Sequence, residues 1–236
     1  MQRSSPKPRV VFVHGTGLFG IAAWPYQHRL ASTYDCLFVR RHGFAPDTAP
    51  LRTDFRADMN IIVENLGDGG HLVAHSQGAV AAMMAAVERP ELVASLTLFE
   101  PACLSLTADL PATKAHRKRL EPLFAARDGL DDEQYHREFS RLVLGASAKP
   151  LASAADRLQA RRLRLQDPPW TAPLHIVPGV RTLVVTGGWE PLYEEVAEYL
   201  ATTGAAHRHA ANNHRPQDTP EGHGLLVDFL AAGQHG

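Results

Sequence analysis

Residues 71–78 have the sequence HLVAHSQG, in which Ser76 stands between small residues. A short apolar run precedes this serine, and an alanine-rich segment, residues 78–87, follows it. The short apolar run is typical of a buried strand, and residues 78–87 have the composition of a helix. A strand that turns directly into a helix holds Ser76 in a strained backbone conformation and requires small neighbours. The pattern predicts a nucleophilic hydroxyl at a helix N-terminus, where developing negative charge is favoured.

Two observations bear on this interpretation of Ser76. Ala74 stands where the usual G-x-S-x-G pattern has its first glycine, and serine is also a good helix N-cap, so a purely structural role is possible. Residues 10–17, VVFVHGTG, favour catalysis, because a strand followed by a glycine-bearing loop can direct a backbone N–H toward the serine. A plain β-turn would use the same glycines. The two motifs together favour a catalytic serine.

The elements that must position these residues follow from the alternation of apolar runs with stretches of helical periodicity. This alternation predicts βαβ units and a mostly parallel sheet that is covered on both faces. The predicted strands are residues 9–13, 36–39, 71–75, 95–100, 181–186 and 206–210. The predicted helices are residues 24–31, 53–65, 77–89, 191–203 and a last helix that ends near 230–232.

Residues 101–179 interrupt this alternation with helical periodicity, several prolines and no strand pattern. We expect helical pieces at 114–127, 132–144 and 153–165, followed by a proline-rich connector at 167–179. The predicted domain organisation is therefore one α/β core made of residues 1–100 and 180–236. A helical lid, residues 101–179, is inserted after the strand that ends at Glu100.

Taken together, these features resemble the α/β-hydrolase superfamily over essentially the full length of the chain. The resemblance rests on residues 14–17 (HGTG), residues 74–78 (AHSQG), the helical insert at the place of the family's lid, and a late histidine. The match begins at what would be the family's third strand, so the family's first two strands are expected to be absent and the six predicted strands form a mostly parallel sheet flanked by helices. The resemblance also implies that Ser76 is the nucleophile and that the backbone N–H groups of Gln77 and of Thr16, or of Gly17, form the oxyanion hole.

The general base implied by the resemblance is a histidine in the loop after the last strand, and the chain has 13 histidines. We expect His214, because it follows the predicted strand 206–210 at the catalytic edge, with Asn213 supplying a positive φ. His207 and His209 are expected to share one face of that strand. A His-x-His pair suggests a metal site, but the sequence offers no third ligand at a suitable spacing, so we expect no metal.

Two carboxylates are candidates for the acid that orients the histidine. Glu190 follows the penultimate strand, where most of the family has its aspartate, whereas Glu100 ends the strand 95–100, as in haloalkane dehalogenases and some lactone hydrolases. Both positions lie at the carboxyl edge of the sheet. We favour Glu100, since a glutamate that ends an apolar strand is costly to bury without a partner. Glu190 is also explained by a solvent-exposed place at a helix N-terminus.

The serine also narrows the reaction class, because dehalogenases and epoxide hydrolases of this fold have an aspartate at the same turn. We predict hydrolysis of an ester, a lactone or a related carbonyl bond through an acyl-enzyme on Ser76, which water activated by His214 then releases. Two other classes remain open, since the fold also hosts them: a lyase or cyclase without hydrolytic chemistry, and a non-catalytic ligand receptor.

An apolar substrate pocket is expected at the catalytic edge. The residues predicted to form it are Gly15, His75, Trp24, Trp170 and Trp189, with Phe19 and Phe44 also near this edge. Apolar residues of the insert could line the underside of the lid: Leu104, Leu106, Phe124, Phe139 and Leu142. Amphipathic helices would show the same pattern without a pocket.

The composition excludes several classes of protein. The chain has 236 residues, 44% hydrophobic and 21% charged, which is ordinary for one folded domain. Its net charge of −1 gives no basic field for nucleic acid. The longest apolar run, residues 78–87, is too short to span a bilayer, and the N-terminus lacks a signal-peptide core. We expect a cytoplasmic monomer or homodimer that acts on a small molecule without a cofactor, and whose Cys36 and Cys103 are buried thiols.

Overall fold

The structure is a computed structural model of the chain, and it describes residues 7–46, 48–145, 147–148, 150–211 and 213–233. Six strands form one sheet: β1 (Arg9–Val13), β2 (Asp35–Val39), β3 (Gly70–His75), β4 (Val93–Phe99), β5 (Thr182–Thr186) and β6 (Ala206–His209). Their order is β2-β1-β3-β4-β5-β6, and every neighbouring pair is parallel. The predicted α/β-hydrolase fold with a parallel six-stranded sheet is confirmed.

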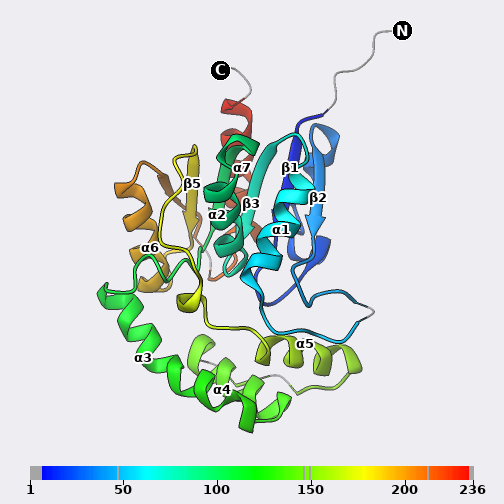
Figure 1. Cartoon of the computed structure of the whole chain (residues 1–236), viewed down its shortest axis with the longest axis vertical. Helices are drawn as coiled ribbons and strands as arrows, with labels where there is room; N and C mark the ends of the chain where they lie inside the picture. The colour runs from blue at the N-terminus through cyan, green and yellow to red at the C-terminus, as the bar shows by residue number, and fades with distance from the viewer. Residues whose placement is uncertain (1–6, 47, 146, 149, 212, 234–236) are drawn as a thin grey trace.

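Helices cover both faces of the sheet because its central strands are apolar on both sides. On one face, α1 (Phe55–Leu66), α2 (Gly78–Glu88) and α6 (Pro191–Thr202) pack on side chains such as Val11 and Val13. On the other face, α7 (Pro220–Ala232) and two short 3-10 segments pack on Val10 and Phe12. The alternation of side chains along β1 thus divides the core into two layers (Figure 1).

The predicted helix 24–31 is wrong. The chain forms two 3-10 segments instead, η1 (Gly20–Ala23) and η2 (Gln27–Ser32). Pro25 separates them, because a proline disfavours helical geometry in the preceding residue, and Trp24 has φ −135° and ψ 67°. The Trp24 side chain is buried against Phe12 and Phe99, with ring centroids 5.2 and 6.3 Å away.

Three helices separate β4 from β5: α3 (Pro111–Ala126), α4 (Asp132–Leu144) and α5 (Ala154–Arg164). They lie beyond the carboxyl ends of the strands, across the bottom of the view in Figure 1. A capping box of Asp131 and Gln134 begins α4, and Gly145, at φ 61°, ends it. The division of the chain into a core and a lid stays a prediction.

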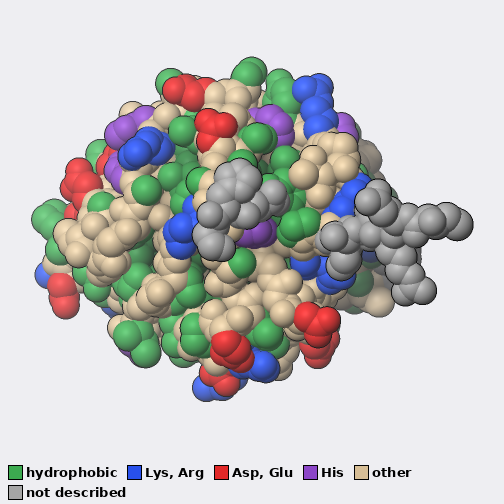
Figure 2. Space-filling model, turned by 90° about the horizontal axis from the view of Figure 1, so that it is seen from above, with side chains coloured by type: hydrophobic (Ala, Val, Ile, Leu, Met, Phe, Trp, Pro, Cys, Tyr) green, Lys and Arg blue, Asp and Glu red, His purple; other side chains and the backbone are tan. Residues whose placement is uncertain are grey.

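Figure 2 shows the end of the molecule that lies opposite helices α3–α5. Acidic and basic side chains are interspersed on this face. No helix within the described ranges is both long and apolar enough to cross a bilayer. Cys103 is buried as expected, whereas Cys36 is only partly buried, because β2 is an edge strand.

Candidate active site

Ser76 lies directly after β3 and has φ 53°, a left-handed conformation, in agreement with the backbone strain predicted for this turn. Three backbone hydrogen bonds hold this turn. The Ser76 amide donates to the Phe99 carbonyl at 2.9 Å, and the Ser76 carbonyl accepts from the Ala79 and Ala102 amides at 3.0 and 3.1 Å. The strained residue is therefore fixed between β4 and the start of α2.

Two glycines allow the segments around Ser76 to approach closely. A Cβ on Gly78 would lie 2.3 Å from the His14 carbonyl oxygen and 2.8 Å from that of Val13, so only glycine lets α2 begin against the end of β1. A Cβ on Gly15 would lie 3.0 Å from the Ser76 Cβ. Ala74 is fully buried between neighbouring strands, and its small side chain is accommodated there.

His214 faces Ser76 from the loop after β6. Its Nε2 lies 2.9 Å from the Ser76 Oγ, which is hydrogen-bonding distance. The His214 carbonyl accepts a 2.7 Å hydrogen bond from His75 Nε2. Burial, and then the neighbouring His214, lower the pKa of His75 well below 6.5, so His75 is a neutral donor that anchors the loop. The predicted positive φ of Asn213 stays a prediction, because this angle depends on residue 212, which lies outside the described residues.

Glu100 lies on the far side of His214. Its side chain is completely buried, and its Oε2 is 3.5 Å from His214 Nδ1. The same carboxylate accepts hydrogen bonds from the Gly187 amide at 2.5 Å and from Trp189 Nε1 at 3.0 Å. These donors compensate for burial of the charge and aim Oε2 at the imidazole. Glu100 has φ 46°, a second left-handed residue at a strand end that the sequence did not reveal.

Glu190, the alternative acid, is directed elsewhere. It is the N-cap residue of α6, and its Oε1 lies 3.7 Å from the guanidinium of Arg119 on α3. A quarter of its side chain is exposed. The geometry therefore groups Ser76, His214 and Glu100, with Glu190 outside the group.

The loop after β1 borders the same site. Thr16 and Gly17 line the cavity beside Gln77 and Ser76. Helix α5 holds this loop, because the Gln159 side-chain amide donates to the Thr16 carbonyl at 3.1 Å and to the Gly17 carbonyl at 2.6 Å. Within the described ranges, neither the Thr16 nor the Gln77 backbone amide is the donor of a hydrogen bond. Both amides are thus available to a ligand.

A buried polar network supports this loop from behind. The Arg41 guanidinium pairs with Asp58 at 2.8 Å, both side chains being at most 2% exposed, and also reaches the Gly15 carbonyl at 3.4 Å. Burial, and then the charge of Arg41, lower the pKa of His14 from 6.5 to about 3. Neutral His14 can therefore donate from Nδ1 to the Gly15 carbonyl at 2.7 Å and accept the Arg41 amide on Nε2 at 3.1 Å.

A cavity of about 720 Å³ opens above Ser76, between the carboxyl ends of the strands and helices α3–α5. This volume lies within the usual range for small-molecule sites. Most of its wall is apolar and comes from the 101–179 segment and the start of α6: Leu104, Leu120, Phe124, Phe139, Val143, Leu163, Pro169, Trp170 and Leu192. The cavity is thus largely apolar, with polar groups both around Ser76 and on helices α3–α5, such as His116, His136 and Gln159.

The predicted pocket residues divide into two groups. His75, Trp170 and Trp189 line the cavity, as do Leu104, Phe124 and Phe139. Gly15 and Trp24 do not, because Gly15 packs under Ser76 and Trp24 packs beneath the sheet. Four other residues that were predicted near the pocket also do not line the cavity: Phe19, Phe44, Leu106 and Leu142.

Tyr193 is a site residue that the sequence did not reveal. Its ring lies 4.9 Å from that of His214, and it lines the cavity beside Ser76. Burial, and then the charge of Glu100, raise the pKa of Tyr193, so its phenol stays protonated. The only signal in the sequence is its place, three residues after Glu190 in the first turn of α6.

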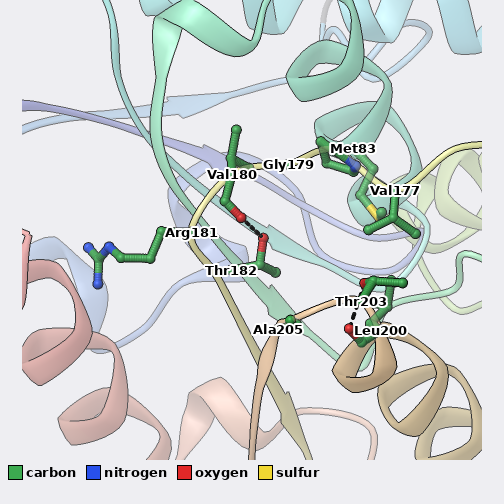
Figure 3. A pocket seen from close by; sticks show the side chains of 11 residues that line it. Met83, Val177, Gly179, Val180, Arg181, Thr182, Leu200, Thr203 and Ala205 are labelled. Atoms are coloured by element: carbon green, nitrogen blue, oxygen red, sulfur yellow. Dashed lines mark hydrogen bonds between the residues drawn. The ribbon is translucent and has the colours of Figure 1, made fainter.

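A smaller hollow of about 280 Å³ lies at the other end of β5 (Figure 3). Its two threonine hydroxyls already donate to backbone carbonyls, Thr182 to Val180 at 2.9 Å and Thr203 to Leu200 at 2.7 Å. Arg181 points away from it, toward the ring of Phe229. Among its described lining residues, no charged or unbonded polar side chain therefore faces a ligand.

A third potential metal ligand lies beside His207 and His209, contrary to the expectation from the sequence spacing. Glu194 of α6 lies against both histidines, and one ligand atom from each of the three side chains falls within 4.8 Å of the others. Glu194 is 13 positions before His207 in the chain, so the spacing that the sequence offered could not reveal it.

Comparison with known proteins agrees with this architecture. The model of the alpha/beta hydrolase family matches residues 10–223, and the chain belongs to this family. Epoxide hydrolase 1 of Caenorhabditis elegans is 27% identical over 125 residues. That match takes in 50% of this chain and 28% of the relative, so the chain spans only about a quarter of that protein's length.

Solved structures share the fold at low sequence identity. MenH from S. aureus is 15% identical with a TM-score of 0.70, over 99% of this chain and 97% of MenH. A carboxylesterase structure from the thaumarchaeon Nitrososphaera gargenis is 14% identical with a TM-score of 0.65, over 98% of this chain and 92% of that one. At these identities the similarity establishes the fold, and the reaction must be argued from the site itself.

Proposed function

We propose that this member of the alpha/beta hydrolase family is a serine hydrolase that cleaves an ester, a lactone or a related carbonyl bond through an acyl-enzyme on Ser76. The observation that carries the proposal is the alignment of three groups at the cavity floor. Ser76 Oγ lies 2.9 Å from His214 Nε2, and His214 Nδ1 faces the buried Glu100 carboxylate at 3.5 Å. A hydroxyl, an imidazole and a carboxylate in this order can generate a nucleophile at neutral pH.

In the first half of the reaction, Ser76 Oγ attacks the substrate carbonyl carbon while its proton passes to His214 Nε2. Glu100 stabilises the resulting imidazolium from the Nδ1 side. The negative charge moves to the substrate oxygen, where the amides of Thr16 and Gln77 and the N-terminus of α2 can receive it. Collapse of this intermediate breaks the bond to the leaving group, which takes the proton from His214.

In the second half, a water molecule gives its proton to His214 Nε2 and attacks the acyl carbonyl carbon. The bond to Ser76 Oγ then breaks, the serine recovers its proton from the imidazole, and the acid leaves. Each group returns to its starting protonation state. The network of Arg41, His14 and Gly15 keeps the Thr16 loop in place throughout.

The hydroxyl of Ser76 also argues against hydrolysis of an epoxide, even though one relative is an epoxide hydrolase. Attack of a serine on an epoxide would leave an ether, which has no carbonyl carbon for water to attack. An aspartate nucleophile would leave a hydrolysable ester instead. Ser76 therefore supports acyl chemistry, in agreement with the expectation from the sequence.

The cavity wall supports a substrate with an apolar body. Aromatic and aliphatic side chains such as Trp170, Phe124 and Leu120 would surround it, while the carbonyl group sits over Ser76. The roof contains His116, whose pKa burial lowers to about 4, with Arg119 adding to the effect, so it presents a neutral imidazole. A neutral, medium-sized ester or lactone matches this chamber.

Hydrolysis of p-nitrophenyl esters of increasing acyl length tests the proposal. Wild type is expected to turn over esters of medium acyl length, and Ser76→Ala to lose activity by a factor of about 10⁴ or more. Ser32→Ala, at an exposed serine that ends η2, is the matched control and is expected to retain wild-type rates. Equal turnover by wild type and Ser76→Ala would overturn the proposal. Absence of serine-dependent turnover across the whole series would favour a lyase or a receptor.

A further inference from the structure

A cluster of metal-ligating side chains lies at the outer edge of the sheet, away from the Ser76 cavity. His207 and His209 alternate with Arg208 on the edge strand β6, so their imidazoles share one face, with ring centroids 4.6 Å apart. Helix α6 brings Glu194 to the same place. Glu194 Oε2 lies 2.8 Å from His209 Nε2 and 3.6 Å from His207 Nε2.

The separations of these atoms suit a common central ion. Two ligands that each lie about 2.05 Å from a tetrahedral zinc ion are about 3.3 Å apart. The distances of 2.8 and 3.6 Å from Glu194 Oε2 bracket that value. The three ligand atoms all lie within 4.8 Å of one another, so rotation of the histidine side chains would be needed to bring them onto one coordination sphere.

The surroundings of the cluster orient its carboxylate. The second oxygen of Glu194, Oε1, accepts a hydrogen bond from the Gly188 amide at 3.1 Å. The Thr186 hydroxyl donates to Oε2 at 3.0 Å and lies 2.7 Å from His207 Nε2. The hydrogen bonds from Gly188 and Thr186 to the carboxylate are of the kind that fixes ligand orientation in metal sites, whereas the contact of Thr186 with His207 Nε2 must break before that nitrogen can bind an ion.

The charge of the cluster also favours a cation. Two donors, Thr186 Oγ1 and His209 Nε2, already reach the single oxygen Oε2, and His207 Nε2 lies 3.6 Å from it. A metal ion would replace the two imidazole protons and take the lone pairs of both nitrogens. Glu198, near His207, adds a negative charge, and Arg208 offsets it.

We propose that Glu194, His207 and His209 bind one zinc ion, with water in the fourth position. Two imidazole nitrogens and one carboxylate oxygen are a known donor set for zinc. The ion would connect α6 to β6 and, through Thr186 and Gly188, to the loop that follows β5. This loop also carries Gly187 and Trp189, the two donors to Glu100. The zinc ion would thus stabilise the loop that positions Glu100. This structural role does not depend on the reaction proposed above.

Zinc binding by untagged, chelator-treated protein tests the site. Zinc chloride is titrated in competition with a chromophoric indicator, and wild type is expected to bind one equivalent with a dissociation constant in the micromolar range or below. His209→Ala and Glu194→Gln are each expected to weaken this binding by at least about tenfold. Gln at position 194 keeps an oxygen for the Gly188 amide, so the fold is expected to be retained. His175→Ala, an exposed histidine elsewhere, is the matched control and is expected to bind as wild type does.

Two further readouts separate a specific site from loose binding by surface histidines. Cobalt(II) in place of zinc is expected to give the visible absorption of a four-coordinate site in wild type and in His175→Ala, and to lose it in His209→Ala. Zinc is expected to raise the midpoint of thermal unfolding of wild type and to leave that of His209→Ala unchanged. Unchanged zinc affinity in both His209→Ala and Glu194→Gln would overturn the proposal, as would a wild type that binds no zinc.

Discussion

The replacement Glu100→Gln is the sharpest probe of the triad, because the surroundings of this side chain dictate how an amide must sit. Oε1 accepts the Gly187 amide at 2.5 Å, and Oε2 accepts Trp189 Nε1 at 3.0 Å. An amide has only one oxygen, so one of these two buried donors must lose its acceptor. The rigid backbone donor at 2.5 Å keeps the oxygen, which places the NH₂ group against Trp189 and His214.

This orientation reverses the protonation of His214. The NH₂ group would donate to Nδ1, so the neutral imidazole would carry its proton on Nε2. An Nε2–H group facing Ser76 Oγ at 2.9 Å cannot accept the serine proton. From the effect of a wrong tautomer in a serine triad, we expect kcat to fall by about 10³- to 10⁴-fold. The unpaired Trp189 donor adds a stability cost of about 1–3 kcal/mol.

Steady-state hydrolysis of a p-nitrophenyl ester measures the effect, with urea unfolding alongside it. KM is expected to change little, because Glu100 is fully buried and does not line the cavity. Glu190→Gln is the matched control, since Glu190 lies after β5, at the N-terminus of α6, and faces Arg119. Its kcat is expected to stay within about threefold of wild type. A large loss in Glu190→Gln with a near-normal Glu100→Gln would refute the assignment of the acid.

Three further predictions concern the support of the site. Gly78→Ala places a Cβ 2.3 Å from the His14 carbonyl oxygen. The free energy of unfolding measured in urea is therefore expected to fall by about 1–3 kcal/mol. The kcat is also expected to fall, because the Thr16 loop would shift. Arg41→Met leaves the buried Asp58 carboxylate unpaired, and a loss of about 3–5 kcal/mol is expected in the same assay; a loss below 1 kcal/mol would contradict the described ion pair. The folded-state pKa of His14, about 3, lies below the unfolded value of 6.5, so the unfolded chain takes up a proton first as pH falls. Between about pH 7.5 and 5, wild type should therefore lose about 2 kcal/mol more unfolding free energy than His14→Asn; parallel pH curves would contradict a neutral His14.

Much of the fold was predictable because the signals are local. Apolar runs predicted the strands to within two residues at either end, as for the predicted 71–75 and the observed Gly70–His75. The predicted helix 132–144 coincides with α4, since its first residue follows the N-cap Asp131 and its last precedes Gly145. The helix 24–31 failed because its apolar residues pack under the sheet as 3-10 turns, interrupted at Pro25.

The candidate site was predictable where one short segment creates the geometry. The motif around Ser76 gave its strained turn, and the position of His214 after the last strand brought it to the same edge. Glu100 could be favoured because a charge that ends a buried strand needs partners, yet its left-handed backbone had no signal.

Contacts between distant segments could not be predicted from one sequence. Tyr193 approaches His214, and Gln159 reaches the Thr16 loop, only because the chain folds α6 and α5 back over the sheet edge. Glu194 meets His207 and His209 for the same reason. Trp24 was misplaced because an aromatic side chain beside a catalytic loop can point into the core as easily as into the cavity.

The acyl-enzyme itself is the most direct test of the central claim. Wild-type protein is mixed with a medium-chain p-nitrophenyl ester, quenched in acid at early times, and measured by intact-protein and peptide mass spectrometry. We predict a mass increase of one acyl group, located on Ser76, that His214→Ala fails to accumulate at the wild-type rate. An acyl group on another residue, or steady turnover in Ser76→Ala, would contradict the account.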